Sequence, residues 1–313
     1  MDKEKKKFLR RKLGWISLRV FTLMNGILSL RFSYFLGKIL GRVAFFLVLR
    51  HKKIALESLS IAFPQLSVKM RKRITSDFFI FMAQSSLELF HYLKNSYSLE
   101  NVGIEGKENL DNALKKRKGV IILTAHFGNF PLMSLKLVKE GYPVSVVARP
   151  MRDRKAGDYI HSLRTKAGVK TIFSYPRKEC VSNVIKALRN NEIVIIQMDQ
   201  NFGTGGVWVK FFNKLAATPV GPIIFSLRTN SPIVPVYICR EKDFYHLIKI
   251  FPEEDLTITE DRNKTILLNA AKFTRIIENW IKEYPSQWSW IHRRWKSRPP
   301  QEVKKLKFKI ETH

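Results

Sequence analysis

Two polar residues of this sequence, His126 and Asp199, each follow a continuous apolar run of the length of a β-strand. The runs are VIILTA at residues 120–125 and EIVIIQM at residues 192–198. In a mostly parallel sheet, ligands bind just beyond the carboxyl ends of the strands, so the pattern predicts that the two side chains lie near one another. An imidazole with an ordinary pKa of about 6.5 can act as a general base while a carboxylate holds its second ring nitrogen. The pair therefore predicts base catalysis, although His126 could also simply end its strand and Asp199 could cap a loop.

The residues after His126 predict a helix start beside this base. The sequence HFGN at residues 126–129 indicates a strand end, a tight turn at Gly128 and an N-cap at Asn129, whose side chain would accept backbone N–H groups. Pro131 suits the first turn, because its missing N–H would have had no partner there. The free N–H groups would favour an anion near His126. We therefore expect Gly128 and Asn129 to contribute to substrate binding.

The composition is strongly basic, with 56 lysine and arginine residues against 26 aspartate and glutamate residues, a formal net charge of +30. Such a field attracts nucleic acid, anionic lipid headgroups or an acidic protein. Nucleic acid ranks last, because no helix-turn-helix, zinc-finger or RNA-recognition signature accompanies the charge. The two cysteines, Cys180 and Cys239, form no ligand spacing, so we expect neither a disulfide scaffold nor a metal. The GTGG at residues 203–206 lacks the ending of a phosphate loop, so no nucleotide cofactor is expected.

The elements that would carry these residues alternate between short apolar runs and amphipathic stretches, many of which close on glycine. This pattern predicts an α/β fold with a mostly parallel central sheet flanked by helices. A helical lead-in occupies residues 51–95, and a polar turn surrounds residues 101–106. We expect strands at residues 120–125, 142–148, 192–198, 232–239 and 244–251, and helices at residues 131–141, 152–168 and 265–282.

The N-terminal part predicts membrane-associated helices. Its apolar stretches at residues 13–30 and 34–49 are interrupted by Arg19 and by Lys38 and Arg42. A cation in the middle of a span costs roughly 2.5–3.5 kcal/mol, so we interpret both as helices lying on anionic lipid, with ordinary core helices as the alternative. No small-residue cleavage site follows the first stretch, which disfavours a signal peptide. The resulting domain organisation is a basic, membrane-associated helical segment at 1–50, an α/β domain with its helical lead-in at 51–298, and a basic tail at 299–313.

Four stretches in the same order give the chain a family resemblance. They are SLSIAFP at residues 58–64, HFGNF from His126, MDQNFGTGGVWVKFFNKLAATPVGP at residues 198–222 and PSQWSWIHRRWK at residues 285–296. Together they resemble the late acyltransferases of lipid A biosynthesis, within the wider lysophospholipid acyltransferase group, over about residues 13 to 298. The resemblance implies transfer of a fatty acyl chain from acyl carrier protein to a hydroxyl of an anionic glycolipid. It also implies action at the cytoplasmic face of the inner membrane.

One position departs from the family. The family places Asp or Glu after a histidine and four residues, but here Pro131 follows His126 at that spacing. We expect Asp199 to supply the missing carboxylate. Glu88 is a weaker candidate, because the resemblance does not single it out. Alternatively, the proline indicates that the chain is a catalytically inactive homologue that binds or scaffolds envelope lipid.

Further residues match the family outside this motif. Arg149 and Arg164 would hold the acceptor phosphate or polarise the thioester carbonyl, or else be solvated surface arginines. Thr218 and Pro219 would begin a helix near the site. The side chains of residues 207, 208, 211 and 212 would line an acyl-chain groove, with aromatic core packing as the alternative. The aromatic and basic cluster at residues 288–295 would lie at the level of the lipid headgroups.

Overall fold

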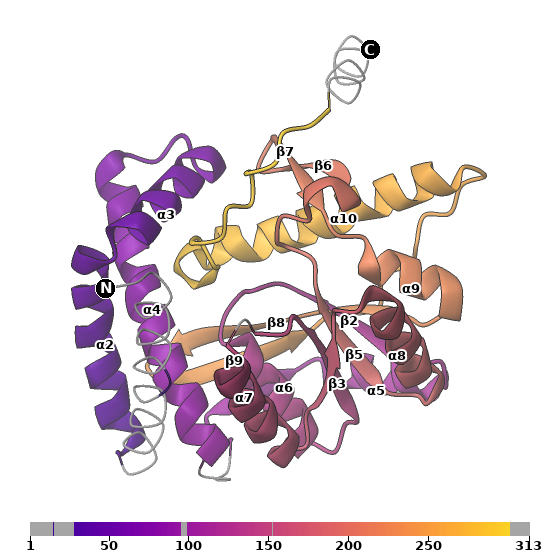
Figure 1. Cartoon of the computed structure of the whole chain (residues 1–313), viewed down its shortest axis with the longest axis horizontal. Helices are drawn as coiled ribbons and strands as arrows, with labels where there is room; N and C mark the ends of the chain where they lie inside the picture. Colours follow the sequence, from indigo (N-terminus) through magenta and orange to yellow (C-terminus); the bar gives the residue numbers. More distant parts are fainter. Residues whose placement is uncertain (1–14, 16–27, 95–98, 152, 301–313) are drawn as a thin grey trace, which may run out of the picture.

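The computed structural model describes residues 15, 28–94, 99–151 and 153–300, which fold as an α/β protein (Figure 1). The strands are β1 (Val102–Glu105), β2 (Val120–Thr124), β3 (Val144–Ala148), β4 (Lys170–Phe173), β5 (Ile193–Gln197), β6 (Val207–Phe211), β7 (Lys214–Thr218), β8 (Ile233–Lys242) and β9 (Tyr245–Ile250). The α-helices are α2 (Leu30–Leu47), α3 (Leu49–Ala62), α4 (Val68–Lys94), α5 (Lys107–Lys115), α6 (Phe130–Lys139), α7 (Arg154–Lys166), α8 (Arg177–Arg189), α9 (Gly221–Thr229) and α10 (Arg262–Glu283). Short 3-10 turns lie at Gly203–Gly205 and Pro285–Gln287.

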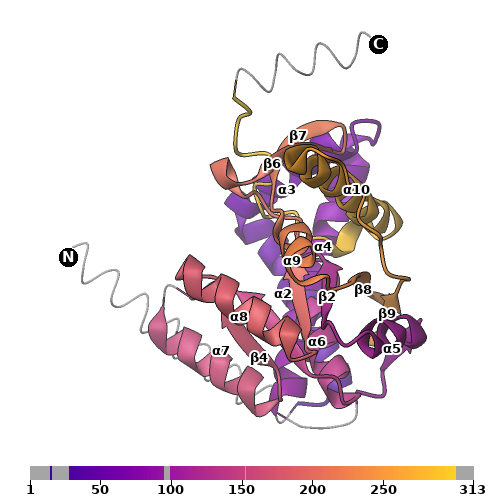
Figure 2. The ribbon, with the colours of Figure 1, turned by 90° about the vertical axis from the view of Figure 1, so that its right-hand side faces the viewer.

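The central sheet has seven strands in the order β1-β9-β8-β2-β5-β3-β4. Five of them, β8, β2, β5, β3 and β4, run parallel to one another, whereas β9 pairs with β8 in antiparallel fashion and β1 runs parallel to β9. The prediction of a mostly parallel sheet is therefore confirmed. The hairpin of β6 and β7 forms a separate sheet beside α10 (Figure 2).

Helices cover both faces of the sheet, because the central strands are apolar on both. Every residue of β2 is buried. Val120 and Ile122 pack in one cluster with residues of α5 and α6, whereas Ile121 and Leu123 pack in the other with residues of α8, α9 and α10. Such a run without alternation is typical of a strand between two helical layers.

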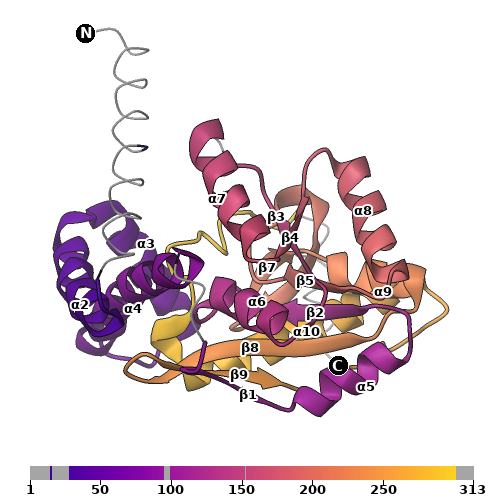
Figure 3. The ribbon, with the colours of Figure 1, turned by 90° about the horizontal axis from the view of Figure 1, so that it is seen from below.

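Helices α2 and α4 lie side by side at one end of β8 and β9 (Figure 3). The buried residues of α2 are all small: Ser33, Gly37 and Gly41. A Cβ atom on Gly41 would lie 2.4 Å from the Cα atom of Ile80 on α4, so the two backbones can approach only with glycine there. The large side chains point outward, and Phe46 and Leu47 are 68% and 74% exposed. Small residues of α2 thus face α4 while several large apolar residues face outward, the reverse of the usual amphipathic helix of a globular protein.

Among the described residues, no single helix is both long and apolar enough to cross a membrane. Helices α2 and α3 together meet that length and composition, but they are bent by 88° at the break between them. The expected helix at residues 34–49 is thus observed as most of α2. The basic stretch 3–12, nearly all of the apolar stretch 13–30, and residues 301–313 of the tail lie outside the described residues.

The main strands and helices agree with the sequence-based predictions, with local exceptions. The expected polar turn at residues 101–106 is wrong, since Val102–Glu105 forms the edge strand β1. Thr218 ends β7 rather than starting a helix, and α9 begins three residues later, at Gly221. Helices α5 and α8 and strands β4, β6 and β7 were not predicted; the four residues KTIF of β4, for example, show no apolar run or alternation.

Candidate active site

His126 and Asp199 are in contact, with 2.8 Å between His126 Nδ1 and Asp199 Oδ1. The register of the sheet explains the contact. Strands β2 and β5 are parallel neighbours in which Thr124 pairs with Gln197, and His126 and Asp199 each lie two positions beyond these paired residues. The expected proximity of the two side chains is therefore observed.

Burial and charge set the chemistry of this pair. The Asp199 side chain is 1% exposed, whereas that of His126 is 27% exposed. Burial by itself would lower the pKa of His126, but the adjacent Asp199 carboxylate outweighs burial and raises that pKa above its ordinary value. Burial would likewise raise the pKa of Asp199, yet its contacts with His126 and Trp288 hold the pKa below its ordinary value. Asp199 is accordingly an anion beside a histidine that can reach solvent.

Trp288 is the third member of the site, and the sequence-based reasoning gave it no chemical role. Its Nε1–H donates to the second carboxylate oxygen, Asp199 Oδ2, at 2.8 Å. The segment around it is bonded to the turn after β2, since Ser289 N donates to the carbonyl of His126 and Gly128 N donates to the carbonyl of Gln287. A tryptophan in an aromatic and basic C-terminal motif gives no signal of this contact, because the partner lies 89 residues away in sequence.

The backbone conformation of the turn requires Gly128. Its φ is +59°, and a Cβ atom there would lie 1.7 Å from the carbonyl oxygen of Ile238 on β8, so the turn requires glycine. Its N–H already donates to Gln287. The expectation that Gly128 binds substrate directly therefore needs correction. Its N–H already has a protein acceptor, and the Ile238 carbonyl lies against its Cα.

Asn129 occupies the expected N-cap position of α6, but its side chain does not cap the helix. It is 2% exposed, and its Nδ2 donates to the carbonyl of Ser85 and to Glu88 Oε2, each at 3.2 Å. The amide is thus turned into the protein, toward α4. The N–H groups of Leu132 and Met133 donate instead to the Asn129 carbonyl, and Pro131 carries no N–H.

The two predicted substrate arginines lie at opposite edges of the sheet. Arg149 is exposed and directly follows β3, at the same carboxyl edge as His126 and Asp199. Arg164 lies in the last turn of α7, where its carbonyl accepts the N–H of Val169 just before β4 begins. Because β4 is parallel to β3, that turn is at the amino edge, so the structure does not bring Arg164 to the candidate site. Burial lowers the pKa of Arg164 there.

Most of the C-terminal cluster is core, contrary to the expectation of headgroup contact, although Arg293 is exposed. Trp288 and Trp290 are fully buried, and Arg294 is 1% exposed. The Arg294 guanidinium donates to the Ala217 carbonyl and to Thr218 Oγ1 of β7, and burial lowers its pKa to about 10. These contacts attach the β6–β7 hairpin to the C-terminal segment that carries Trp288. The same cluster places His292 near the pair, where its Nε2 accepts the N–H of Asn201 at 2.9 Å and burial lowers its pKa.

The aromatic side chains after the GTGG turn divide between the two interpretations. Phe211 and Phe212 are 1% and 7% exposed and belong to the core, with Phe211 next to Trp288 and Trp295. Val207 and Trp208 are half-buried. The groove interpretation is thus wrong for the two phenylalanines and open only for Val207 and Trp208.

A second carboxylate lies close to the turn. Glu88 on α4 is 1% exposed, and its Oε2 accepts from Arg240 Nη2 at 2.6 Å and faces His246 Nε2 at 3.1 Å. Burial would raise the pKa of Glu88, but Arg240 and His246 hold it below its ordinary value. Glu88 is therefore not the acid that replaces the family's residue at Pro131; it bonds to Asn129, not to His126.

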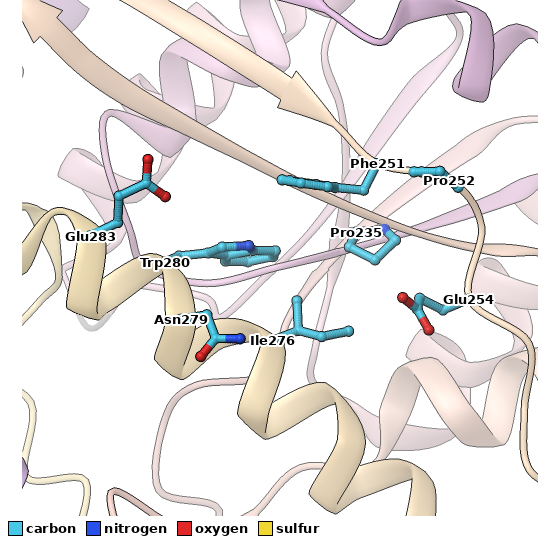
Figure 4. Close-up of a pocket in the computed structure, with 8 residues that line it drawn as sticks. All are labelled: Pro235, Phe251, Pro252, Glu254, Ile276, Asn279, Trp280 and Glu283. Carbon is cyan, nitrogen blue, oxygen red and sulfur yellow. The ribbon is translucent and has the colours of Figure 1, made fainter.

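A cavity of about 370 Å³ lies between the start of β8 and α10 (Figure 4). Pro235, Phe251 and Trp280 form its apolar part, and Glu254 and Glu283 lie at its rim. It shares no residue with the His126–Asp199 pair. Within the described ranges, no group of three or more His, Cys, Asp or Glu side chains could hold a metal ion.

Comparison with known proteins identifies relatives of this chain. The family model described as bacterial lipid A biosynthesis acyltransferase matches residues 1–297. The lipid A biosynthesis palmitoleoyltransferase of Escherichia coli is 26% identical over 271 residues, 85% of each chain. The lipid A biosynthesis lauroyltransferase of the same organism is 25% identical over 293 residues, 92% of each chain.

More distant similarities extend beyond lipid A. The phosphatidylinositol mannoside acyltransferase of Mycolicibacterium smegmatis is 24% identical over 63% of each chain. Among solved structures, a 1-acyl-sn-glycerophosphate acyltransferase from Thermotoga maritima covers 81% of this chain and 98% of its own. That similarity has a TM-score of 0.38 and 14% identity.

Proposed function

Because this chain belongs to the bacterial lipid A biosynthesis acyltransferase family, we propose that it transfers a fatty acyl group to a hydroxyl of a lipid A precursor. The acyl donor would be the thioester of acyl carrier protein, an acidic partner suited to a chain of net charge +30. The observation that carries the proposal is the 2.8 Å contact between His126 and Asp199 at the carboxyl edge of the sheet. Two relatives of this chain named above, the palmitoleoyltransferase and the lauroyltransferase of Escherichia coli, are acyltransferases of lipid A biosynthesis.

In this proposal His126 is the general base. Asp199 holds Nδ1, so Nε2 is the nitrogen that accepts the hydroxyl proton of the acceptor. The acceptor oxygen then attacks the thioester carbonyl and forms a tetrahedral oxyanion. Collapse of the oxyanion breaks the carbon–sulfur bond, and the imidazolium returns its proton to the departing thiolate. The ester product and the free thiol balance the reaction, and His126 ends neutral.

Asp199 favours this cycle electrostatically. A buried anion next to His126 stabilises the imidazolium that forms in the middle of the reaction, which is consistent with the raised pKa of His126. The Phe130 N–H, at the start of α6 beside His126, is our candidate for stabilising the oxyanion. Arg149 at the same edge would contact the acceptor phosphate.

We further propose that α2 holds the protein on the cytoplasmic face of the inner membrane. Its outward face carries Phe35, Phe46 and Leu47, each at least half exposed. Burying one such side chain in lipid contributes about 1.5–3 kcal/mol. Basic residues on the same protein would add attraction to anionic headgroups.

An acyl transfer assay with acyl carrier protein donors and lipid A precursors tests the chemistry. We expect transfer by the wild-type protein and a loss of about 100-fold to 10,000-fold in His126→Ala. A fully folded wild type that transfers no acyl chain would support the scaffolding alternative instead. In that case Pro131→Glu, which restores the family's acid, should confer activity.

Sedimentation with anionic vesicles tests the membrane contact. The double variant Phe46→Ser/Leu47→Ser should bind vesicles more weakly than the wild type. Leu267→Ser/Leu268→Ser is the matched control, because those leucines are 44% and 40% exposed on α10, away from α2. Equal losses in the two double variants would argue against α2 as the contact.

A further inference from the structure

The Asn129 side chain occupies an unusual position for an N-cap residue. Its amide is buried and donates to two groups of α4, the carbonyl of Ser85 and Glu88 Oε2. Neither bond satisfies a helix N–H, so the side chain contributes nothing to the helix that it begins. What it does instead is join the turn carrying His126 to α4.

The residue before Asn129 in the same turn, Gly128, is joined to the same cluster by a second route. The Gly128 N–H donates to the carbonyl of Gln287, and the Gln287 side chain accepts from the N–H and donates to the carbonyl of Arg240. The Arg240 guanidinium then returns to α4, with bonds to Glu88 Oε2 at 2.6 Å, Gln84 Oε1 at 3.0 Å and Ser85 Oγ at 3.1 Å. The turn is thus connected to both members of one buried ion pair, to Glu88 through Asn129 and to Arg240 through Gln287.

We infer that Asn129 and the Glu88–Arg240 pair are positioning residues for the acyl transfer proposed above, on which this inference rests. They touch no substrate. They fix the turn at residues 126–129, and thereby the alignment of the His126 ring with Asp199 and of the Phe130 N–H with the reacting carbonyl. The fixed turn is needed because proton transfer and oxyanion stabilisation depend on distances near 3 Å.

Replacement of Asn129 tests the donor without disturbing the ion pair. Asn129→Asp keeps the size of the side chain but turns an oxygen toward Glu88, and Asn129→Ala removes the contact. We expect both variants to lower kcat by about 10-fold to 100-fold, because a displacement of about 1 Å can cost that much. The KM values should stay near those of the wild type. The acidic limb of the pH–rate profile should move to lower pH as His126 loses its close contact with Asp199.

Glu192→Gln is the matched control. Glu192 bonds Ser145 and Lys170 at the opposite edge of the sheet, just before the strand that leads to Asp199. That variant should keep kcat and the position of the acidic limb, even if it is less stable. The shift of the limb separates positioning from partial unfolding, since unfolded molecules lower the rate at every pH without moving the limb.

The outcomes of these assays distinguish a failure of the positioning role from a failure of the proposed acyl transfer. If the wild type transfers acyl chains in a His126-dependent way but folded Asn129→Asp and Asn129→Ala keep the wild-type kcat, the positioning role is overturned. A lowered rate with an unmoved limb in both variants would overturn it as well. If the folded wild type transfers no acyl chain, the proposed function fails, and the inference that depends on it fails with it.

Discussion

Two buried carboxylates in this protein each face a histidine, and the two pairs differ in access. Asp199 Oδ1 lies 2.8 Å from His126 Nδ1, and Glu88 Oε2 lies 3.1 Å from His246 Nε2. His126 is 27% exposed, whereas His246 is fully buried. Only the first histidine can exchange a proton with a substrate, so a histidine–carboxylate contact by itself does not identify an active site.

The remaining partners of the carboxylates separate the pairs further. Asp199 receives its second bond from Trp288, a neutral donor, so its negative charge stays available to the His126 imidazolium. Glu88 is bonded by the Arg240 guanidinium, which neutralises it within the protein. In the proposed mechanism the first pair stabilises a charge that appears during the reaction, whereas the second pair joins α4 to the β8–β9 hairpin. Replacing the carboxylate by an amide should therefore lower mainly kcat in the first pair and mainly the free energy of unfolding in the second.

The largest effect is expected for Asp199→Asn. The substitution keeps the shape of the side chain but removes the anion that stabilises the imidazolium and fixes its tautomer. We expect kcat for acyl transfer to fall by about 100-fold to 10,000-fold. Thermal unfolding of the same preparation serves as the control, since the variant should remain folded at the assay temperature. Turnover within a few-fold of the wild type would remove Asp199 from the mechanism.

Breaking the second pair should act mainly on stability. Glu88→Gln leaves the buried Arg240 cation without its counter-charge, and breaking a buried pair in this way costs about 3–5 kcal/mol of unfolding free energy. Denaturant titration measures the loss. The double variant Glu88→Met/Arg240→Met should recover much of it, because neither charge then remains buried. Its kcat should stay lowered, since Asn129 no longer has a carboxylate acceptor; full recovery of both quantities would make the pair purely structural.

A smaller effect on kcat is expected when Trp288, the neutral donor to Asp199, is replaced. Trp288→Phe removes the bond to Asp199 Oδ2 and keeps most of the ring. A hydrogen bond to a charged group contributes about 1.5–3 kcal/mol, so a loss of about 10-fold in kcat is expected if roughly half of it is realised in the transition state. Trp290→Phe is the control, because Trp290 packs against Trp288 but donates to the Pro285 carbonyl. Equal losses in the two variants would indicate damaged packing rather than a weakened dyad.

The His126–Asp199 pair could be predicted because parallel strands make a local pattern informative over long distances. Each residue follows its strand by the same offset, and the paired strands are apolar enough to be recognised. The Pro131 departure was informative as well, since it directed attention to a carboxylate elsewhere in the chain. The order of the strands in the sheet was not predicted, because a local apolar pattern does not show which strands pair.

The second pair and Trp288 could not be predicted, because their partners come from antiparallel and irregular parts of the fold. Arg240 and His246 lie on opposite strands of the β8–β9 hairpin, and Glu88 reaches them from a helix more than 150 residues earlier. Asn129 had the residue type and position of an N-cap, so the local rule predicted the wrong use of its side chain. A buried acceptor nearby outweighed that rule.

The smallest expected effect is a shift in the acidic limb of the pH–rate profile. It depends on the negative charge that Asp199 places beside His126. His126 acts as a base only when neutral, and its pKa is raised above the ordinary value by Asp199 against the opposing effect of burial. The acidic limb of kcat/KM should therefore have its midpoint above about 6.5 in the wild type. In Asp199→Asn the raising charge is gone while burial remains, so the limb of the residual activity should move to lower pH. A limb that stays in place would assign the titration to a group other than His126, and one that moves to higher pH would contradict the electrostatic role of Asp199.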